Sequence, residues 1–250
     1  MLRAMLLCLV AATSIGSSAL AQERKPPVPP GRDPGGVAIG LVSTGIDYTL
    51  PSIVPRLARD GEGELIGWDM ADNDRQPFDR TKGATPPQWG GDGTAVASFL
   101  LGGVVRLVPV RVDPADPGSL ARAVAFMAQT PARLVLLPIA DARPDALEGL
   151  RRAAVRYKSL SIILPAAEGD AIAEALKGLD NVITVRQGAA GVDATGFGGR
   201  AQRLSGAPLA VAAAGMAAAR LLSREPQIDA RTLKRRLMEA GGEVLWRIGE

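Results

Sequence analysis

The chain of 250 residues contains no histidine, a single cysteine and few aromatic residues, which make up 4% of it. Without histidine, no side chain changes its charge near neutral pH at its unperturbed pKa, which excludes the common imidazole general base. Cys8, the only cysteine, lies in the N-terminal apolar stretch, so no disulfide can staple the rest of the chain. The fold must therefore be stabilised by an ordinary hydrophobic core, and the chain is long enough to form one.

The net charge is +3 and the sequence pI is about 9.3, a basic balance that would suit an anionic partner. However, the basic residues are scattered or lie on expected helix faces, for example Arg151, Arg152, Arg156 and Lys158. The scarcity of aromatic rings also leaves few surfaces on which the bases of single-stranded nucleic acid could stack. We therefore interpret the basic residues as solvated helix faces and expect no nucleic-acid partner.

The first residues have the pattern of an export signal. Arg3 supplies a positive charge, residues 5–15 are mostly apolar, and an Ala-x-Ala site ends at Ala21. This pattern predicts a signal peptide over residues 1–21 and export to the periplasm or out of the cell. The alternative is an uncleaved anchor, although the apolar stretch is short for a stable transmembrane helix. We expect no membrane span after cleavage of the signal.

Residues 22–36 are rich in Pro, Gly and charge, which predicts an extended or disordered lead-in before a single domain over residues 37–250. Within this domain, apolar strand patterns alternate with helix patterns. The expected strands are 37–42, 64–70, 104–112, 134–139, 160–165 and 182–186, and the expected helices are 92–101, 119–129, 144–157, 172–178, 208–223 and 230–240. The alternation predicts an α/β fold in three layers, with a mostly parallel central sheet and helices on both faces.

Five segments carry a more specific signal. They are the Ser-Thr-Gly-Ile-Asp run after the first strand, the Gly-Trp-Asp loop at 67–79, the Gly-Asp-Gly-Thr run at 91–94, the strand and turn at 161–170, and the Ser-Gly-Ala-Pro helix start at 205–208. In this order and at this spacing, the segments resemble the subtilisin-like serine protease family, the subtilases. The resemblance covers about residues 37–240 and implies the three-layer subtilisin-like fold, with chemistry at the carboxyl ends of the strands.

The same resemblance indicates that the catalytic residues are replaced. Ser43 falls on the triad aspartate and Asp92 on the histidine, while Gly169 falls on the asparagine that stabilises the oxyanion. Pro208 falls on the nucleophile, or Ala207 does if the later glycine of that helix fixes the register. Loss of one oxyanion donor alone lowers turnover by about a hundred- to a thousand-fold. An independent interpretation of Pro208 is that it lies in the first turn of its helix, where proline is common.

These replacements favour an exported pseudoprotease without peptidase activity, which binds a peptide or protein in the former substrate groove or has a scaffolding or regulatory role. One alternative is an active hydrolase with a rearranged site, in which Ser205 is the nucleophile and Asp92 is the base. Another is an unrelated α/β domain whose Ala- and Gly-rich segments imitate the family. If the resemblance holds, Ser43 and Asp92 should lie within hydrogen-bonding distance of each other, at about 2.6–3.2 Å.

The loop at 67–79 carries acidic residues of the kind that bind calcium. Asp69, Asp72 and Asp74 are its most closely spaced carboxylates, with Asn73 and Asp79 nearby. The other interpretation is a set of turn residues that make local hydrogen bonds, and we favour it. We therefore expect no cofactor.

Overall fold

A computed structural model describes residues 25–81, 88–102, 104–139, 142–167, 169–186, 188 and 190–244 of the chain. The expected signal peptide, residues 1–21, and Glu168 lie outside these ranges.

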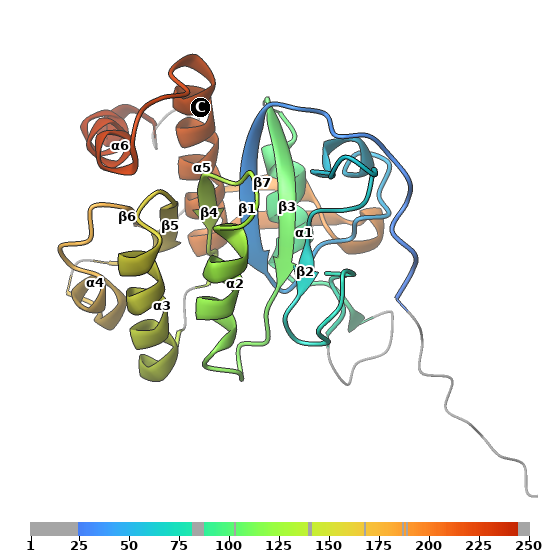
Figure 1. Cartoon of the computed structure of the whole chain (residues 1–250), viewed down its shortest axis with the longest axis horizontal. Helices are drawn as coiled ribbons and strands as arrows, with labels where there is room; N and C mark the ends of the chain where they lie inside the picture. The colour runs from blue at the N-terminus through green and yellow to red at the C-terminus, as the bar shows by residue number, and fades with distance from the viewer. Residues whose placement is uncertain are drawn as a thin grey trace, which may run out of the picture.

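In the described residues, six parallel strands form the central sheet, in the order β2-β3-β1-β4-β5-β6 (Figure 1). The strands are β1 (Val37–Ser43), β2 (Trp68–Asp69), β3 (Val105–Arg111), β4 (Leu134–Leu136), β5 (Ser161–Pro165) and β6 (Val182–Val185). Each of β1, β3, β4 and β5 is almost entirely buried, because both faces of the sheet are covered. Apolar residues therefore run continuously along these strands instead of alternating with polar ones.

The helices form the outer two layers. They are α1 (Asp92–Leu100), α2 (Ser119–Met127), α3 (Pro144–Arg156), α4 (Ala171–Ala175), α5 (Gly206–Arg224) and α6 (Ala230–Val244). One core joins alternate residues of the strands to α1, α5 and α6, and a second joins the opposite face to α2, α3 and α4. The predicted α/β fold, with a mostly parallel sheet and helices on both faces, is confirmed.

The structure differs from the sequence-based expectation mainly in an antiparallel hairpin that was not predicted. Strands β7 (Gly191–Thr195) and β8 (Ala201–Ser205) form a separate two-stranded sheet. Most of their residues are exposed or half-buried, and both contain charged residues, so they lack the apolar run by which the other strands are recognised. The predicted strand at 64–70 is reduced to the two residues of β2.

Helix α5 passes through the core and begins beside the hairpin. Pro208 is its third residue, where the backbone has no intrahelical hydrogen-bond donor to lose, so the expected first-turn role of this proline is confirmed. Among the described residues, α5 alone is long and apolar enough to span a membrane by length and composition. Most of it is buried against the sheet, as expected of a core helix.

The lead-in at residues 25–36 contains no helix or strand, yet it is bound to the domain. Asp33 accepts hydrogen bonds from the backbone N–H of Arg59, at 2.9 Å, and from the guanidinium of Arg106, at 2.5 Å. In Figure 1 the segment follows the right-hand side of the molecule as a blue trace.

Candidate functional site

The sequence-predicted site residues lie at strand ends and helix starts. Ser43 ends β1, and Asp92 begins α1. Gly169 follows β5, and Pro208 lies in the first turn of α5. The carboxyl ends of parallel strands are where ligands bind in open α/β sheets, and we refer to this part of the molecule as the carboxyl edge.

The predicted hydrogen bond between Ser43 and Asp92 is wrong. The buried hydroxyl of Ser43 donates to the carbonyl of Gly45, at 3.2 Å, whereas the exposed carboxylate of Asp92 accepts from the amide of Gln202, at 3.0 Å. The reason is the packing of Gly93. A β-carbon at Gly93 would lie 2.5 Å from the Ser43 oxygen, so the backbone of α1 faces Ser43 and the side chain of Asp92 points outward to β8.

A buried carboxylate that was not predicted for this role holds the start of α1. Asp79, which is 1% exposed, accepts hydrogen bonds from the hydroxyls of Thr44, at 2.9 Å, and Thr94, at 2.8 Å, and from the backbone N–H of Gly91, at 2.9 Å. Burial raises the pKa of the Asp79 carboxyl, although these hydrogen bonds oppose the rise. Asp79 thus joins the end of β1 to the first turn of α1, apart from the other acidic residues of its loop.

An aromatic cluster lies beside this carboxylate. Phe78 packs edge-on against Tyr48, Trp89 and Phe197, with ring centroids 5.1, 6.1 and 5.4 Å apart. Gly90 has a φ of +103°, and a β-carbon there would lie 2.4 Å from Phe197. The cluster therefore fixes the turn that precedes α1 against the segment between β7 and β8.

The acidic loop, residues 69–74, surrounds two cations. The ammonium of Lys25 lies 2.5, 2.9 and 3.0 Å from carboxylate oxygens of Asp69, Asp72 and Asp74. The guanidinium of Arg111 lies 2.8 Å from Asp69 and 3.0 Å from Asp72. Asp69 also accepts from the backbone N–H groups of residues 71 and 72, which are local turn hydrogen bonds. Nothing in the sequence analysis predicted that Lys25, from the lead-in, would contact this loop.

Of the remaining predicted positions, Gly169 and Pro208 carry no reactive group. Gly169 has a φ of +83° and no side chain to donate to an oxyanion, and Pro208 has neither a hydroxyl nor an N–H. Ser205 is exposed, and its hydroxyl has no hydrogen-bond partner in the described part of the chain. Asp92 is bonded to Gln202 instead. The described residues thus show no contact between the base and the nucleophile of the rearranged hydrolase.

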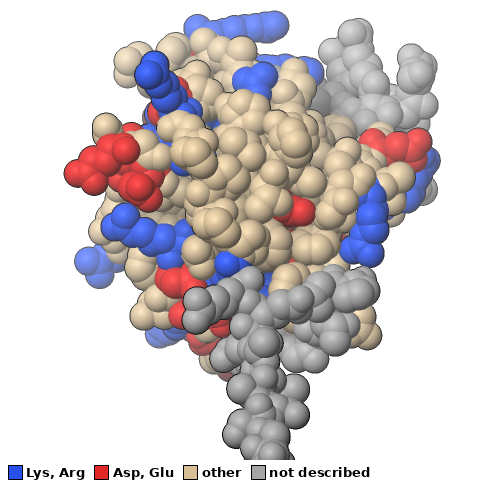
Figure 2. All heavy atoms as spheres, turned by 90° about the vertical axis from the view of Figure 1, so that its right-hand side faces the viewer, with Lys and Arg blue, Asp and Glu red and all other residues tan. Residues whose placement is uncertain are grey.

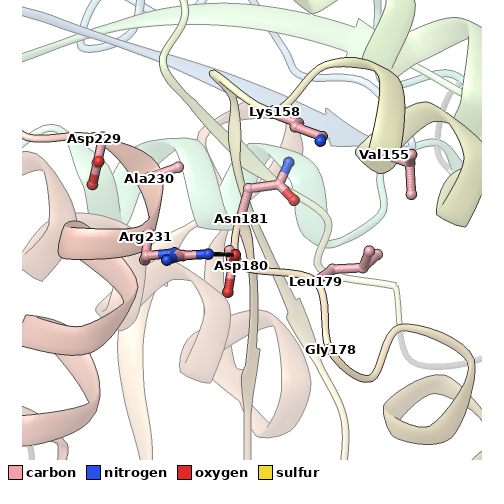
Figure 3. Close-up of a pocket in the computed structure, with 9 residues that line it drawn as sticks. All are labelled: Val155, Lys158, Gly178, Leu179, Asp180, Asn181, Asp229, Ala230 and Arg231. Carbon is pink, nitrogen blue, oxygen red and sulfur yellow. Dashed lines mark hydrogen bonds and ion pairs between the residues drawn. The ribbon is translucent and has the colours of Figure 1, made fainter.

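A pocket of about 350 Å³ opens elsewhere, next to the amino end of β6 (Figure 3). Asn181 lies at its base and donates to the carbonyls of Ala154 and Leu160, at 3.1 Å each, while Arg231 pairs with Asp180 at the side. No sequence-predicted site residue lines this pocket. The pocket lies at the amino end of β6 and therefore does not belong to the carboxyl edge, and the side-chain amide of Asn181 already donates to two backbone carbonyls.

The parallel sheet, its two helix layers and the placement of α1 and α5 define a subtilisin-like fold. Solved structures with this fold include a cold-adapted subtilisin-like serine proteinase, with a TM-score of 0.54 at 16% identity over 82% of each chain. The subtilase cytotoxin SubAB matches with a TM-score of 0.60 at 15% identity, over 83% of this chain and 82% of that one. Sphericase matches with a TM-score of 0.56 at 16% identity, over 82% and 83%.

No protein-family model matches the sequence, and a search of curated proteins finds no match. The identities to the solved structures are low enough that they establish the fold and not the activity. The alternative of an unrelated α/β architecture is nevertheless wrong.

Proposed function

We propose that this chain is an exported subtilisin-like pseudoprotease, which has no peptidase activity and binds a peptide or protein along the carboxyl edge. The observation that carries the proposal is the separation of the two residues that could still react. Ser205 has no hydrogen-bond partner in the described residues, and the carboxylate of Asp92 is bound to Gln202. A serine without an adjacent base is a weak nucleophile near neutral pH.

The proposal that the chain binds a peptide or protein rests on the packing of the carboxyl edge. The turn before α1 is held by Asp79 and by the aromatic cluster, so the edge is rigid although its reagents are gone. The pair formed by Asp92 and Gln202 presents a carboxylate and an amide on its exposed surface. A rigid edge with polar groups at its surface suits recognition of a peptide, because little conformational entropy is lost on binding.

Two assays on the chain from Gln22 to Glu250 test the two halves. We expect no labelling by a fluorophosphonate serine-hydrolase probe and no cleavage of casein above the Ser205→Ala variant. Labelling that disappears in Ser205→Ala would establish the rearranged hydrolase instead. For binding, we expect an array of decapeptides to contain ligands whose affinity falls at least about tenfold in Asp92→Lys, through charge reversal at the edge. The control is Glu62→Lys, an equal reversal at another exposed position. Equal binding by both variants would place the ligand elsewhere.

We also propose that the acidic loop needs no calcium, because Lys25, Arg111 and Arg80 already pair with its three carboxylates. A calcium ion between Asp69, Asp72 and Asp74 would have to displace the ammonium of Lys25. We expect EDTA and millimolar CaCl₂ to give melting temperatures within about 1 °C of each other, since a ligand that does not bind the native state cannot stabilise it. A rise of several degrees in calcium would contradict this.

A further inference from the structure

The lead-in is anchored by one buried cation. The side chain of Lys25 is 6% exposed, and its ammonium is shared by Asp69, Asp72 and Asp74. Burial disfavours the charged amine, but the hydrogen bonds that the ammonium donates to the three carboxylates outweigh this and raise the pKa of Lys25. Burial likewise opposes ionisation of Asp72, but Lys25, Arg111 and Arg80 outweigh it and lower the pKa of that carboxyl. Lys25 and Asp72 are therefore both charged at neutral pH.

Further contacts attach residues 25–33, which we name the strap, along their length. The hydroxyl of Tyr48 donates to the carbonyl of Pro26, at 2.7 Å, and Arg59 donates to the carbonyl of Pro29, at 2.6 Å. The proline-rich sequence favours an extended backbone before it docks, which reduces the entropy lost on docking. Figure 2 views the side of the molecule on which the strap lies, where uncharged residues cover most of the centre around a small acidic patch and most other charged groups lie toward the margins.

Two sets of contacts lead from the strap to the carboxyl edge. The first begins at Tyr48, which bonds Pro26 and packs on Phe78, and Phe78 packs on Trp89 and Phe197 beside the start of α1. The second begins at Asp69, which shares its carboxylate between Lys25 and Arg111. Arg111 ends β3 directly beside Ser43, the last residue of β1. Both sets end at elements that form the carboxyl edge.

We infer that the strap is a latch. The Lys25 ammonium, bound by Asp69, Asp72 and Asp74, stabilises the packing of the carboxyl edge that the structure shows. Without Lys25 the acidic loop loses one of its two buried cations, and the contact between Pro26 and Tyr48 loses its anchor. Cleavage after Ala21, as the signal pattern predicts, leaves Lys25 in the mature chain. A chain that is cleaved after residue 25 lacks the latch. The position of N-terminal cleavage therefore determines whether the packing of the carboxyl edge is stabilised.

Hydrogen exchange followed by mass spectrometry tests the latch in the chain from Gln22 to Glu250. In Lys25→Met we expect amides of residues 88–98 and 191–205 to exchange at least about tenfold faster, together with the strap, while β5 keeps its protection. Lys25→Arg, which keeps the charge, should stay near the parent. Lys158→Met is the matched control, because Lys158 is exposed and has no ion pair in the described residues. Its exchange should not change.

Faster exchange confined to the strap and the acidic loop, or no change at all, would overturn the inference. If Lys25→Met loses protection in β5 as well, the variant has unfolded globally, and Asp74→Asn then decides. The Asp74 side chain is 41% exposed, so this variant weakens the latch without leaving a fully buried charge alone. We expect a smaller acceleration in the same segments, and its absence would overturn the latch. Because exchange reads the backbone and not binding, the result is independent of the proposed function.

Discussion

Replacement of Asp79 by alanine should lower the free energy of unfolding by about 3 kcal/mol, because it removes the acceptor of three donors, of which the Thr94 hydroxyl is fully buried. These donors are the hydroxyls of Thr44 and Thr94 and the backbone N–H of Gly91. The first turn of α1 and the end of β1 lose their common partner, and the vacated volume adds a cavity. For a domain of this size, the melting temperature should fall by about 6–12 °C.

Asp79→Asn separates the charge of this residue from its hydrogen bonds. An amide oxygen can accept from Thr44 and Gly91, while its NH₂ group can donate to the hydroxyl of Thr94. Burial raises the folded-state pKa of Asp79 above its ordinary value of 3.8. The folded wild type therefore binds the proton more tightly than the unfolded chain does. As pH rises from the unfolded-state pKa to the folded-state pKa of Asp79, ionisation of this residue lowers the free energy of unfolding.

The advantage of Asp79→Asn over the wild type should consequently grow as pH rises from about 4 and then become constant above the folded-state pKa. Urea unfolding of the wild type, Asp79→Asn and Asp79→Ala between pH 4 and pH 8 measures both effects. Asp145→Ala serves as the control, since that aspartate is largely exposed and lies outside the carboxyl edge. A variant Asp79→Ala as stable as the wild type, or a difference for Asp79→Asn that does not change with pH, would contradict the assignment.

The strands of the central sheet could be predicted from the sequence. Burial on both faces requires a continuous run of apolar residues, and each strand is such a run. The helices could be predicted from their apolar periodicity, and α1 begins at Asp92 as expected. The hairpin of β7 and β8 could not, because Leu204 is its only fully buried residue, while Val192 and Ala194 are half-buried, so its apolar pattern is too short and weak to indicate a strand.

The candidate site was predicted in position but not in contacts. The resemblance placed Ser43, Asp92, Gly169 and Pro208 at strand ends and helix starts, where the structure has them. Side-chain direction depends on packing that the resemblance does not specify. Because the backbone at Gly93 packs closely against β1, the side chain of Asp92 points away from Ser43. It accepts a hydrogen bond from Gln202, which lies 110 residues away in the sequence. The pairing of Lys25 with the acidic loop is equally distant, over 44 residues to Asp69, and a proline-rich lead-in gives no local signal of it.

The close approach of α1 to β1 explains why glycine occupies positions 45 and 93 at this contact. Gly93 lies in the first turn of α1, where a β-carbon would be 2.0 Å from the carbonyl oxygen of Gly45 and 2.5 Å from the hydroxyl oxygen of Ser43. Gly45 has little room to move, because it has a φ of +105° and a β-carbon built on it would lie 2.7 Å from backbone atoms of Phe78 and 2.9 Å from the backbone nitrogen of Asp79. The start of α1 is therefore held between backbone atoms, which relax less readily than side chains.

Gly93→Ala should for this reason lower the free energy of unfolding by about 3 kcal/mol or more, the upper range for overpacking. Helix propensity alone would favour alanine by about 1 kcal/mol, so a net loss would show that the contact with Gly45 dominates. Gly102→Ala is the matched control, because Gly102 follows the other end of α1 and a β-carbon there meets no atom within 4 Å. Thermal unfolding of both variants should therefore give a fall of about 6 °C or more for Gly93→Ala and almost none for Gly102→Ala. Equal melting temperatures would mean that α1 can move away from β1, and the carboxyl edge would then lack the rigidity on which the proposed peptide binding depends.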